Sequence, residues 1–138
     1  MRKAFGIVIG CTLLCGLVMA AMLAVPPAEN KLVMINGNLE TGGVYPPLFV
    51  LSKSGKDTVQ WKNELSVPCT VSFGRQTPFL DEPIDIPALA TSKEHEPVKA
   101  PDPPKGWKET KPNEIYKVYK YTVSCDGTTF DPGGGMKP

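Results

Sequence analysis

The side chains that could carry chemistry in this 138-residue chain are few, and cysteines are prominent among them. Cys11 and Cys15 lie in an apolar stretch near the N-terminus, whereas Cys69 and Cys125 lie well beyond it, and His95 is the only histidine. Two cysteines can form a disulfide, or as thiolates they can hold a soft metal such as Cu(I) or undergo reversible redox exchange. The compartment in which the protein resides decides between these chemistries.

The N-terminal segment predicts that the protein leaves the cytoplasm. Two basic residues precede an uncharged apolar run at residues 4–25, which ends in small residues that include Ala20 and Ala24. This pattern is typical of a secretory signal peptide spanning residues 1–25. A retained membrane anchor and lipid attachment at Cys11 or Cys15 are the alternatives. All three place the rest of the chain in a periplasmic or other extracytoplasmic space, where the two remaining cysteines are expected to pair.

The charge of the chain excludes some classes of partner. Basic and acidic residues nearly balance outside the first 25 residues, so the sequence has no excess of basic residues that would bind nucleic acid. No run of lysines predicts a lipid-binding surface either. We therefore expect contact with a membrane only through residues 4–25, if that segment is not cleaved.

The residues that an enzyme would need are also missing. Ser66, Ser72 and Ser124 have no neighbouring base, because His95 stands alone between two glutamates in a proline-rich stretch. We expect His95 to be solvated, and the Asp81–Glu82 pair to be a solvated loop charge with no apolar pocket around it. The sequence therefore predicts a protein that is not an enzyme.

Short alternations of apolar and polar residues, broken by turn residues, predict an all-β sandwich. Val59 and Trp61 share one face of a predicted strand, and Cys69 shares a face with its apolar neighbours in another. Asp126-Gly127 is a strong hairpin signal. The predicted strands lie within residues 31–39, 48–51, 57–63, 69–73 and 114–125, with a short return strand after the hairpin. The final glycines are expected to form a tail.

A proline-rich stretch interrupts this pattern at about residues 78–113. Its prolines and charges predict a surface excursion from a single domain that covers residues 30–138. Long loops of this kind are functional or poorly ordered, so His95 and Trp107 mark a candidate interaction loop. We expect the Trp107 ring to pack back on the sandwich, as most tryptophans do, and the alternative is that it serves as an exposed binding residue.

Residues 45–73, YPPLFVLSKSGKDTVQWKNELSVPCTVSF, resemble the N-terminal half of a plastocyanin-like or cupredoxin domain. The shared pattern is an aromatic-x-Pro, a strand, a glycine turn, DTVxWxN, and then VP followed by a ligand position. YKVYKYTVSC resembles the strand that leads to the copper cysteine. The resemblance implies a Greek-key β-sandwich of about six to eight strands that follows the N-terminal apolar segment.

The resemblance also allows the copper ligands of the family to be checked one by one. Cys69 stands where the first histidine would be, and Cys125 lies near the position of the ligand cysteine, two residues later than usual. Thr128 stands where a second histidine is expected, and Met136 does not match the axial methionine. Two cysteines at former ligand positions imply side chains close enough for a disulfide, whose β-carbons lie about 3.8 Å apart.

The resemblance therefore implies a copper-free module, without a cofactor, in which a Cys69–Cys125 disulfide replaces the metal centre. We expect it to act as a structural or protein-interaction module at the outer face of a membrane, with a membrane or exported protein as its partner. The alternative is a copper-binding or thiol-redox protein that uses Cys69 and Cys125. Two sulfurs without nearby imidazoles make a weak metal site, and no Cys-x-x-Cys motif favours redox catalysis.

Overall fold

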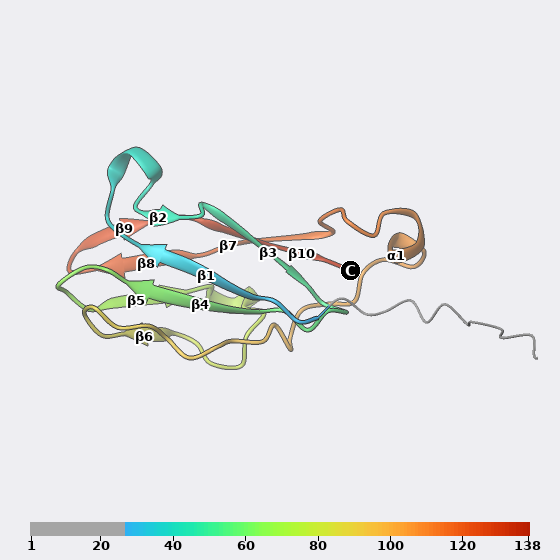
Figure 1. The fold of residues 1–138 in the computed structure, drawn as a ribbon, viewed down its shortest axis with the longest axis horizontal. Coiled ribbons are helices and arrows are strands. Elements are labelled where there is room, and N and C mark those ends of the chain that lie inside the picture. Colours follow the sequence, from blue (N-terminus) through green and yellow to red (C-terminus); the bar gives the residue numbers. More distant parts are fainter. Residues whose placement is uncertain (1–26) are drawn as a thin grey trace, which may run out of the picture.

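A computed structural model describes residues 27–138, which form an all-β sandwich (Figure 1). The predicted signal or anchor segment at residues 1–25 lies outside the described residues. The strands are β1 (Asn30–Ile35), β2 (Val44–Tyr45), β3 (Leu48–Ser52), β4 (Thr58–Asn63), β5 (Cys69–Ser72), β6 (Ile84–Ile86), β7 (Lys117–Lys120), β8 (Thr122–Cys125), β9 (Thr128–Phe130) and β10 (Gly133–Lys137). Two 3-10 turns, η1 (Leu39–Thr41) and η2 (Gly74–Gln76), and one short helix, α1 (Trp107–Thr110), complete the described elements.

The first sheet has the order β2-β1-β4. β1 and β4 run parallel, and β2 pairs antiparallel with the end of β1. The free edge of β4 is covered by the segment 91–95, which forms isolated bridges from Thr91 to Lys62 and from His95 to Val59. The segment 91–95 therefore acts as an irregular edge strand of this sheet.

The other two sheets have the orders β6-β5-β8-β9 and β3-β10-β7. β7 and β8 are consecutive in the chain and are separated only at Tyr121, whose amide bonds to the carbonyl of Pro132. Their partners β9 and β10 follow each other in the same way, so a long hairpin joins the two sheets. Because each arm of this hairpin is interrupted, it counts as four strands, and the structure has more strands than the expected six to eight.

The inner faces of the sheets meet in an aromatic core. The side chains of β4 alternate between buried and more exposed, as the sequence pattern predicts, and Trp61 is fully buried. The Trp61 ring lies 6.0 Å from that of Tyr121, the residue between β7 and β8, and its indole N–H donates to the Tyr121 hydroxyl at 3.4 Å. Burying a large apolar side chain contributes about 1.5–3 kcal/mol to folding, so these rings stabilise the packing of the sheets against one another.

The predicted turn at Asp126-Gly127 is confirmed. Asp126 and Gly127 both have positive φ angles, 45° and 80°, and they join β8 to β9. Positive φ at both central residues is the geometry of the tightest hairpin turns, for which Asp-Gly is favoured. Gly37 also has a positive φ, of 68°, in the loop between β1 and β2. The latter loop projects from one end of the molecule, and α1 lies at the other (Figure 1).

The expectation that the final glycines form a tail is wrong. They form β10, which lies between β3 and β7. The ring of Phe49 covers Gly134, and a Cβ there would lie 2.5 Å from the ring. The side chain of Ile115 covers Gly135 in the same way. Glycine is required here because neighbouring side chains occupy the space that a Cβ would need.

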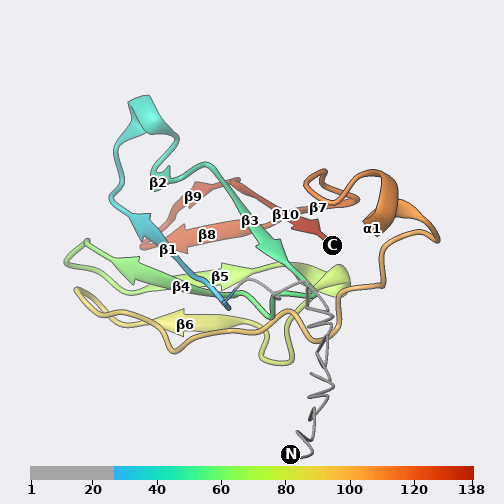
Figure 2. The same cartoon turned by 45° about the vertical axis from the view of Figure 1, so that its right-hand side comes forward.

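The proline-rich stretch divides into two parts. Its first part belongs to the sandwich, because it contains β6 and the edge segment 91–95, and because Phe79 is 1% exposed. The remainder leaves the sandwich after Ala100, carries α1 and returns at β7 (Figure 2). The surface excursion is therefore shorter than the sequence predicts. Apolar residues scattered among the prolines anchor the first part to the core.

Candidate functional site

Cys69 and Cys125 form a disulfide at one end of the sandwich. Cys69 begins β5 and Cys125 ends β8, and the antiparallel register places them directly opposite each other. Their Cα atoms lie 4.3 Å apart, and both residues are almost fully buried. The loop that the bridge closes is long, with 56 residues of sequence separation. The predicted pairing is therefore present in the structure.

The other residues compared with copper ligands do not form a ligand set around this bridge. Thr128 is exposed and lies across from Cys125 at the start of β9. Met136 is buried at the far end of β10, opposite Lys117. His95 lies along β4, opposite Val59. Blue copper needs two imidazoles and a thiolate, and this set of residues does not fit it.

Among residues 27–138, no group of three or more His, Cys, Asp or Glu side chains is arranged to hold a metal ion. While the bridge is intact, neither sulfur is a thiolate, which is the form of cysteine that binds metals. The geometry therefore provides a covalent cross-link between β5 and β8.

Asn63 builds the loop that leads into the disulfide. Its side chain is fully buried at the end of β4, and its amide nitrogen donates to the carbonyls of Val67, Ile86 and Pro87 at 2.7, 3.4 and 3.1 Å. Its side-chain oxygen accepts from the amide of Leu65 at 2.9 Å. A buried amide that is satisfied in this way fixes two chain segments at once. Asn63 thus holds the β4–β5 loop against the chain that follows β6.

Several loops at the same end of the sandwich carry apolar side chains. Leu39 in η1 is 80% exposed, and Leu89 in the turn after β6 is 71% exposed. Leu65 and Val67 lie between these two loops and are partly buried against the core. The carbonyl of Leu65 accepts from the amide of Leu89 at 3.0 Å, and the Leu65 side chain lies against Gly37. We call Leu39, Leu65, Val67 and Leu89 the apolar end.

The expectation that His95 is a solvated loop residue is wrong. His95 is 5% exposed, and its ring lies 5.7 Å from that of Trp61 and 5.9 Å from that of Phe79. Its amide and carbonyl both bond to Val59, at 2.9 and 3.0 Å. The flanking glutamates made the stretch look solvated, but the backbone pairing with β4 turns His95 inward between them.

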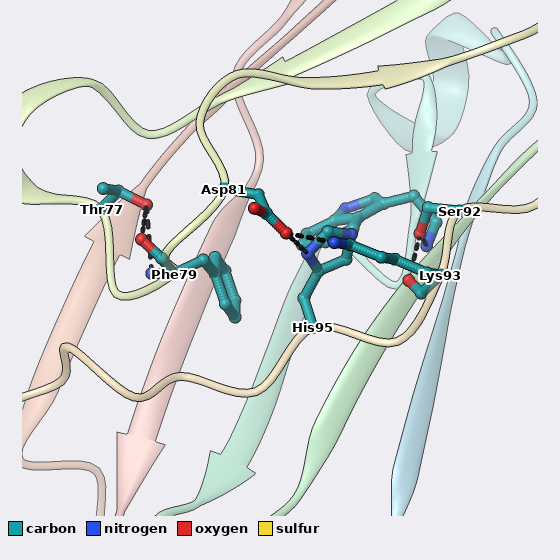
Figure 3. Close-up of polar contacts among 7 residues, drawn as sticks. Thr77, Phe79, Asp81, Ser92, Lys93 and His95 are labelled. Carbon is teal, nitrogen blue, oxygen red and sulfur yellow. Dashed lines mark hydrogen bonds and ion pairs between the residues drawn. The ribbon is translucent and has the colours of Figure 1, made fainter.

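Asp81 and Lys93 lie over the buried histidine (Figure 3). The Lys93 ammonium is 2.5 Å from Asp81 Oδ2, and the same oxygen is 4.0 Å from Nδ1 of His95. Hydrogen bonding and charge from Lys93 lower the pKa of Asp81. Burial lowers the pKa of His95, Lys93 lowers it further, and Asp81 opposes the shift. A cavity of about 400 Å³, lined by polar side chains and prolines, opens beside the three groups.

The expectation that Glu82 is a solvated loop charge is wrong. One of its carboxylate oxygens accepts from the Ser72 hydroxyl and from the amides of Phe73 and Gly74, at 2.8, 2.6 and 3.0 Å. Glu82 therefore ties the loop before β6 to the end of β5. The sequence contains no signal for this role, because its three donors come from a different part of the chain.

Trp107 lies in α1 and is half-buried within the excursion itself. Its indole N–H donates to the carbonyl of Glu114 at 3.3 Å, and the ammonium of Lys111 lies 4.6 Å from its ring. Trp107 is not part of the core cluster of the described residues. The ring thus packs within its own loop, which differs from the expected packing against the sandwich.

Comparison with protein families, curated sequences and solved structures finds no significant match to this chain. Within residues 27–138, no helix is both long enough and apolar enough to cross a membrane. The assignment of a function therefore rests on the residues and geometry described above.

Proposed function

We propose that the chain is an exported, copper-free, cupredoxin-like module that binds another protein and has no catalytic role. In this proposal the Cys69–Cys125 disulfide takes the place that the metal centre has in the family that the sequence resembles. The observation that carries the proposal is the position of the bridge, which joins the start of β5 to the end of β8. The resemblance places one copper ligand at the first of these strand ends and another within two residues of the second.

The disulfide supports a structural role. A bridge that closes a loop of this length stabilises a domain by roughly 2–5 kcal/mol, mainly by restricting the unfolded chain. Such bridges persist in oxidising compartments, in agreement with the apolar N-terminal segment that predicts export. A metal-free domain can thus keep its two strands together without a bound ion.

The apolar end supports an interaction role. Exposed apolar side chains scattered singly are ordinary, but a group of them at one end of a molecule is typical of a binding surface. Leu39 and Leu89 come from different loops that both contact Leu65 or its neighbours. Asn63 and the disulfide hold the connecting loop rigid, which lowers the entropy that binding would cost.

A site-specific crosslinking experiment in the producing cell tests this proposal. A photoreactive amino acid is placed at position 39, at position 89, or at the control position Val118, which is 60% exposed on β7. We expect one discrete protein adduct, of the same mass, from positions 39 and 89 and none from position 118. Equal crosslinking from all three positions, or none from 39 and 89, would contradict the proposed surface.

A copper titration of the purified protein separates this function from the metal-binding alternative. We expect no stoichiometric binding of copper and no visible charge-transfer band while the disulfide is oxidised. Tight binding of one copper ion to the oxidised protein would overturn the copper-free assignment.

A further inference from the structure

His95 occupies a buried apolar site that suits only its neutral form. It is the only histidine of the chain, and its ring lies between Trp61 and Phe79. Its Nε2 atom is shielded from solvent and has no hydrogen-bond partner among the described residues. A buried group of this kind avoids carrying a charge, because no water or fixed dipole replaces its hydration shell. Burial accordingly holds the pKa of His95 below its ordinary value.

The nearest anion is within reach but is paired elsewhere. Asp81 Oδ2 lies 4.0 Å from Nδ1 of His95, which is beyond hydrogen-bond distance, and 2.5 Å from the ammonium of Lys93. Figure 3 shows the Asp81 carboxylate facing both nitrogen atoms. A protonated imidazole and the lysine would compete for the same carboxylate. Since both Asp81 and Lys93 are more than half exposed, the bond between them is weak enough to exchange.

The remaining charged groups around His95 do not offer an alternative partner. Glu94 and Glu96 flank it in the sequence and are exposed, and the Glu94 carboxylate accepts from the Thr58 hydroxyl. Asp85 lines the same cavity and accepts from the hydroxyl of Thr70. The aromatic rings packed against His95 carry no charge. Asp81 is therefore the anion that a charged ring would approach.

Movement of the ring would act directly on the sandwich edge. His95 is joined to Val59 of β4 by two backbone hydrogen bonds, and the Ser92 amide bonds to the carbonyl of Trp61 at 2.8 Å. The segment 91–95 pairs with β4 only through isolated bridges, and at Ser92 the Trp61 amide bonds to its hydroxyl and the Gln60 side chain to its carbonyl, both at 3.0 Å. The cavity of about 400 Å³ beside it gives the ring space to turn toward Asp81.

We propose that His95 is an acid-sensitive latch: protonation of its imidazole draws the ring from between Trp61 and Phe79 toward Asp81, displaces Lys93 and releases the segment 91–95 from β4. The edge of the first sheet is then closed near neutral pH and open in an acidic surrounding. Opening uncovers the aromatic core at this edge, while the disulfide keeps β5 and β8 together.

Amide hydrogen exchange of the full chain, compared at about pH 8 and about pH 5, tests the latch, because these values bracket the titration of an ordinary imidazole. We expect the protection factors of the Val59 and His95 amides to fall at least about tenfold at the lower pH, while the amides of β5 and β8 keep theirs. His95→Gln cannot protonate and should show no such fall. An equal fall in His95→Gln would overturn the proposal.

Two further measurements keep the test decisive if His95→Gln does not fold. In the wild-type protein the loss of protection at Val59 must share its midpoint with the NMR titration of the single imidazole. Asp81→Asn removes the anion that receives the charged ring, so both midpoints should move to lower pH. Protection at Val59 that stays constant while the imidazole titrates would contradict the latch, as would an unchanged midpoint in Asp81→Asn.

Discussion

Cys69 and Cys125 face each other directly across β5 and β8, with Cα atoms 4.3 Å apart. Directly opposed residues in an antiparallel pair alternate between two spacings, and the closer one, about 4.5 Å, brings the side chains together. The register of the two strands thus aligns both sulfur atoms without any change in the backbone. The disulfide is a consequence of strand pairing, and the turn at Asp126-Gly127 fixes where β8 ends.

Removing the disulfide tests its structural role. The double substitution Cys69→Ala and Cys125→Ala should lower the free energy of unfolding by roughly 2–5 kcal/mol, because it restores conformational freedom to the unfolded chain. Denaturant unfolding, compared with the oxidised and the reduced wild-type protein, gives this difference. The reduced wild type should resemble the double variant. Equal stability of all three proteins would mean that the bridge does not support the fold.

The buried histidine predicts a pH dependence of stability. The pKa of His95 in the folded state is lower than the ordinary value of 6.5, so the unfolded chain binds the proton first as the pH falls. Stability should therefore be complete above about pH 6.5 and decline below it, down to the folded-state pKa. Chemical denaturation at several pH values measures the decline. In His95→Gln, the decline in stability should disappear at pH values above those at which carboxylates titrate. An unchanged slope of stability against pH would contradict the assignment.

The glycines of β10 predict a contrast between neighbours. Gly134→Ala should destabilise the protein by about 1–3 kcal/mol, because the new Cβ would lie 2.5 Å from the ring of Phe49. Gly133→Ala is the matched control, because its new Cβ would lie 3.3 Å from the flexible end of the Leu48 side chain. The control should differ from the wild type by less than about 1 kcal/mol. Similar thermal unfolding of both variants would argue against the tight packing over Gly134.

Among the polar residues beside the apolar end, Asn63 is expected to be the one whose substitution lowers stability most. Asn63→Ala removes the partner of the buried carbonyl of Ile86 and of part-buried backbone groups on Leu65, Val67 and Pro87, and should cost roughly 2–4 kcal/mol. Lys62→Ala, on the exposed face of the same strand, should change stability by less than about 0.5 kcal/mol. Denaturant unfolding of both variants measures the difference. Equal effects would show that the amide is not essential to the loop.

The strands were predictable where side chains alternate strongly between two environments. Val59, Trp61 and Cys69 all lie on the buried faces that the period of two indicates, and Asp126-Gly127 forms the expected hairpin. The glycines of β10 carry no side chain, so this strand leaves no such pattern. The Phe49 ring, which is distant in the sequence, packs over Gly134 and leaves no room there for a side chain.

The cysteine pair of the candidate site was also predictable, but the surroundings of His95 were not. Chain composition indicates a solvated loop there, because glutamates flank the histidine. The burial of the ring depends on Trp61 and Phe79, and its anion, Asp81, approaches from the loop before β6. Contacts of this kind between distant segments have no local sequence pattern. The role of Asn63, which joins two loops, was missed for the same reason.

The central claim is that Cys69 and Cys125 are covalently joined, and a non-reducing tryptic digest of the purified protein tests it most directly. Free thiols are first blocked by alkylation, and the peptides are then identified by mass spectrometry. Cleavage after Lys62, Arg75 and Lys120 separates the peptide 63–75 from the peptide 121–138, each with one cysteine. We expect the two peptides to appear as one disulfide-linked species that separates on reduction. Recovery of both peptides apart, each alkylated before reduction, would contradict the claim.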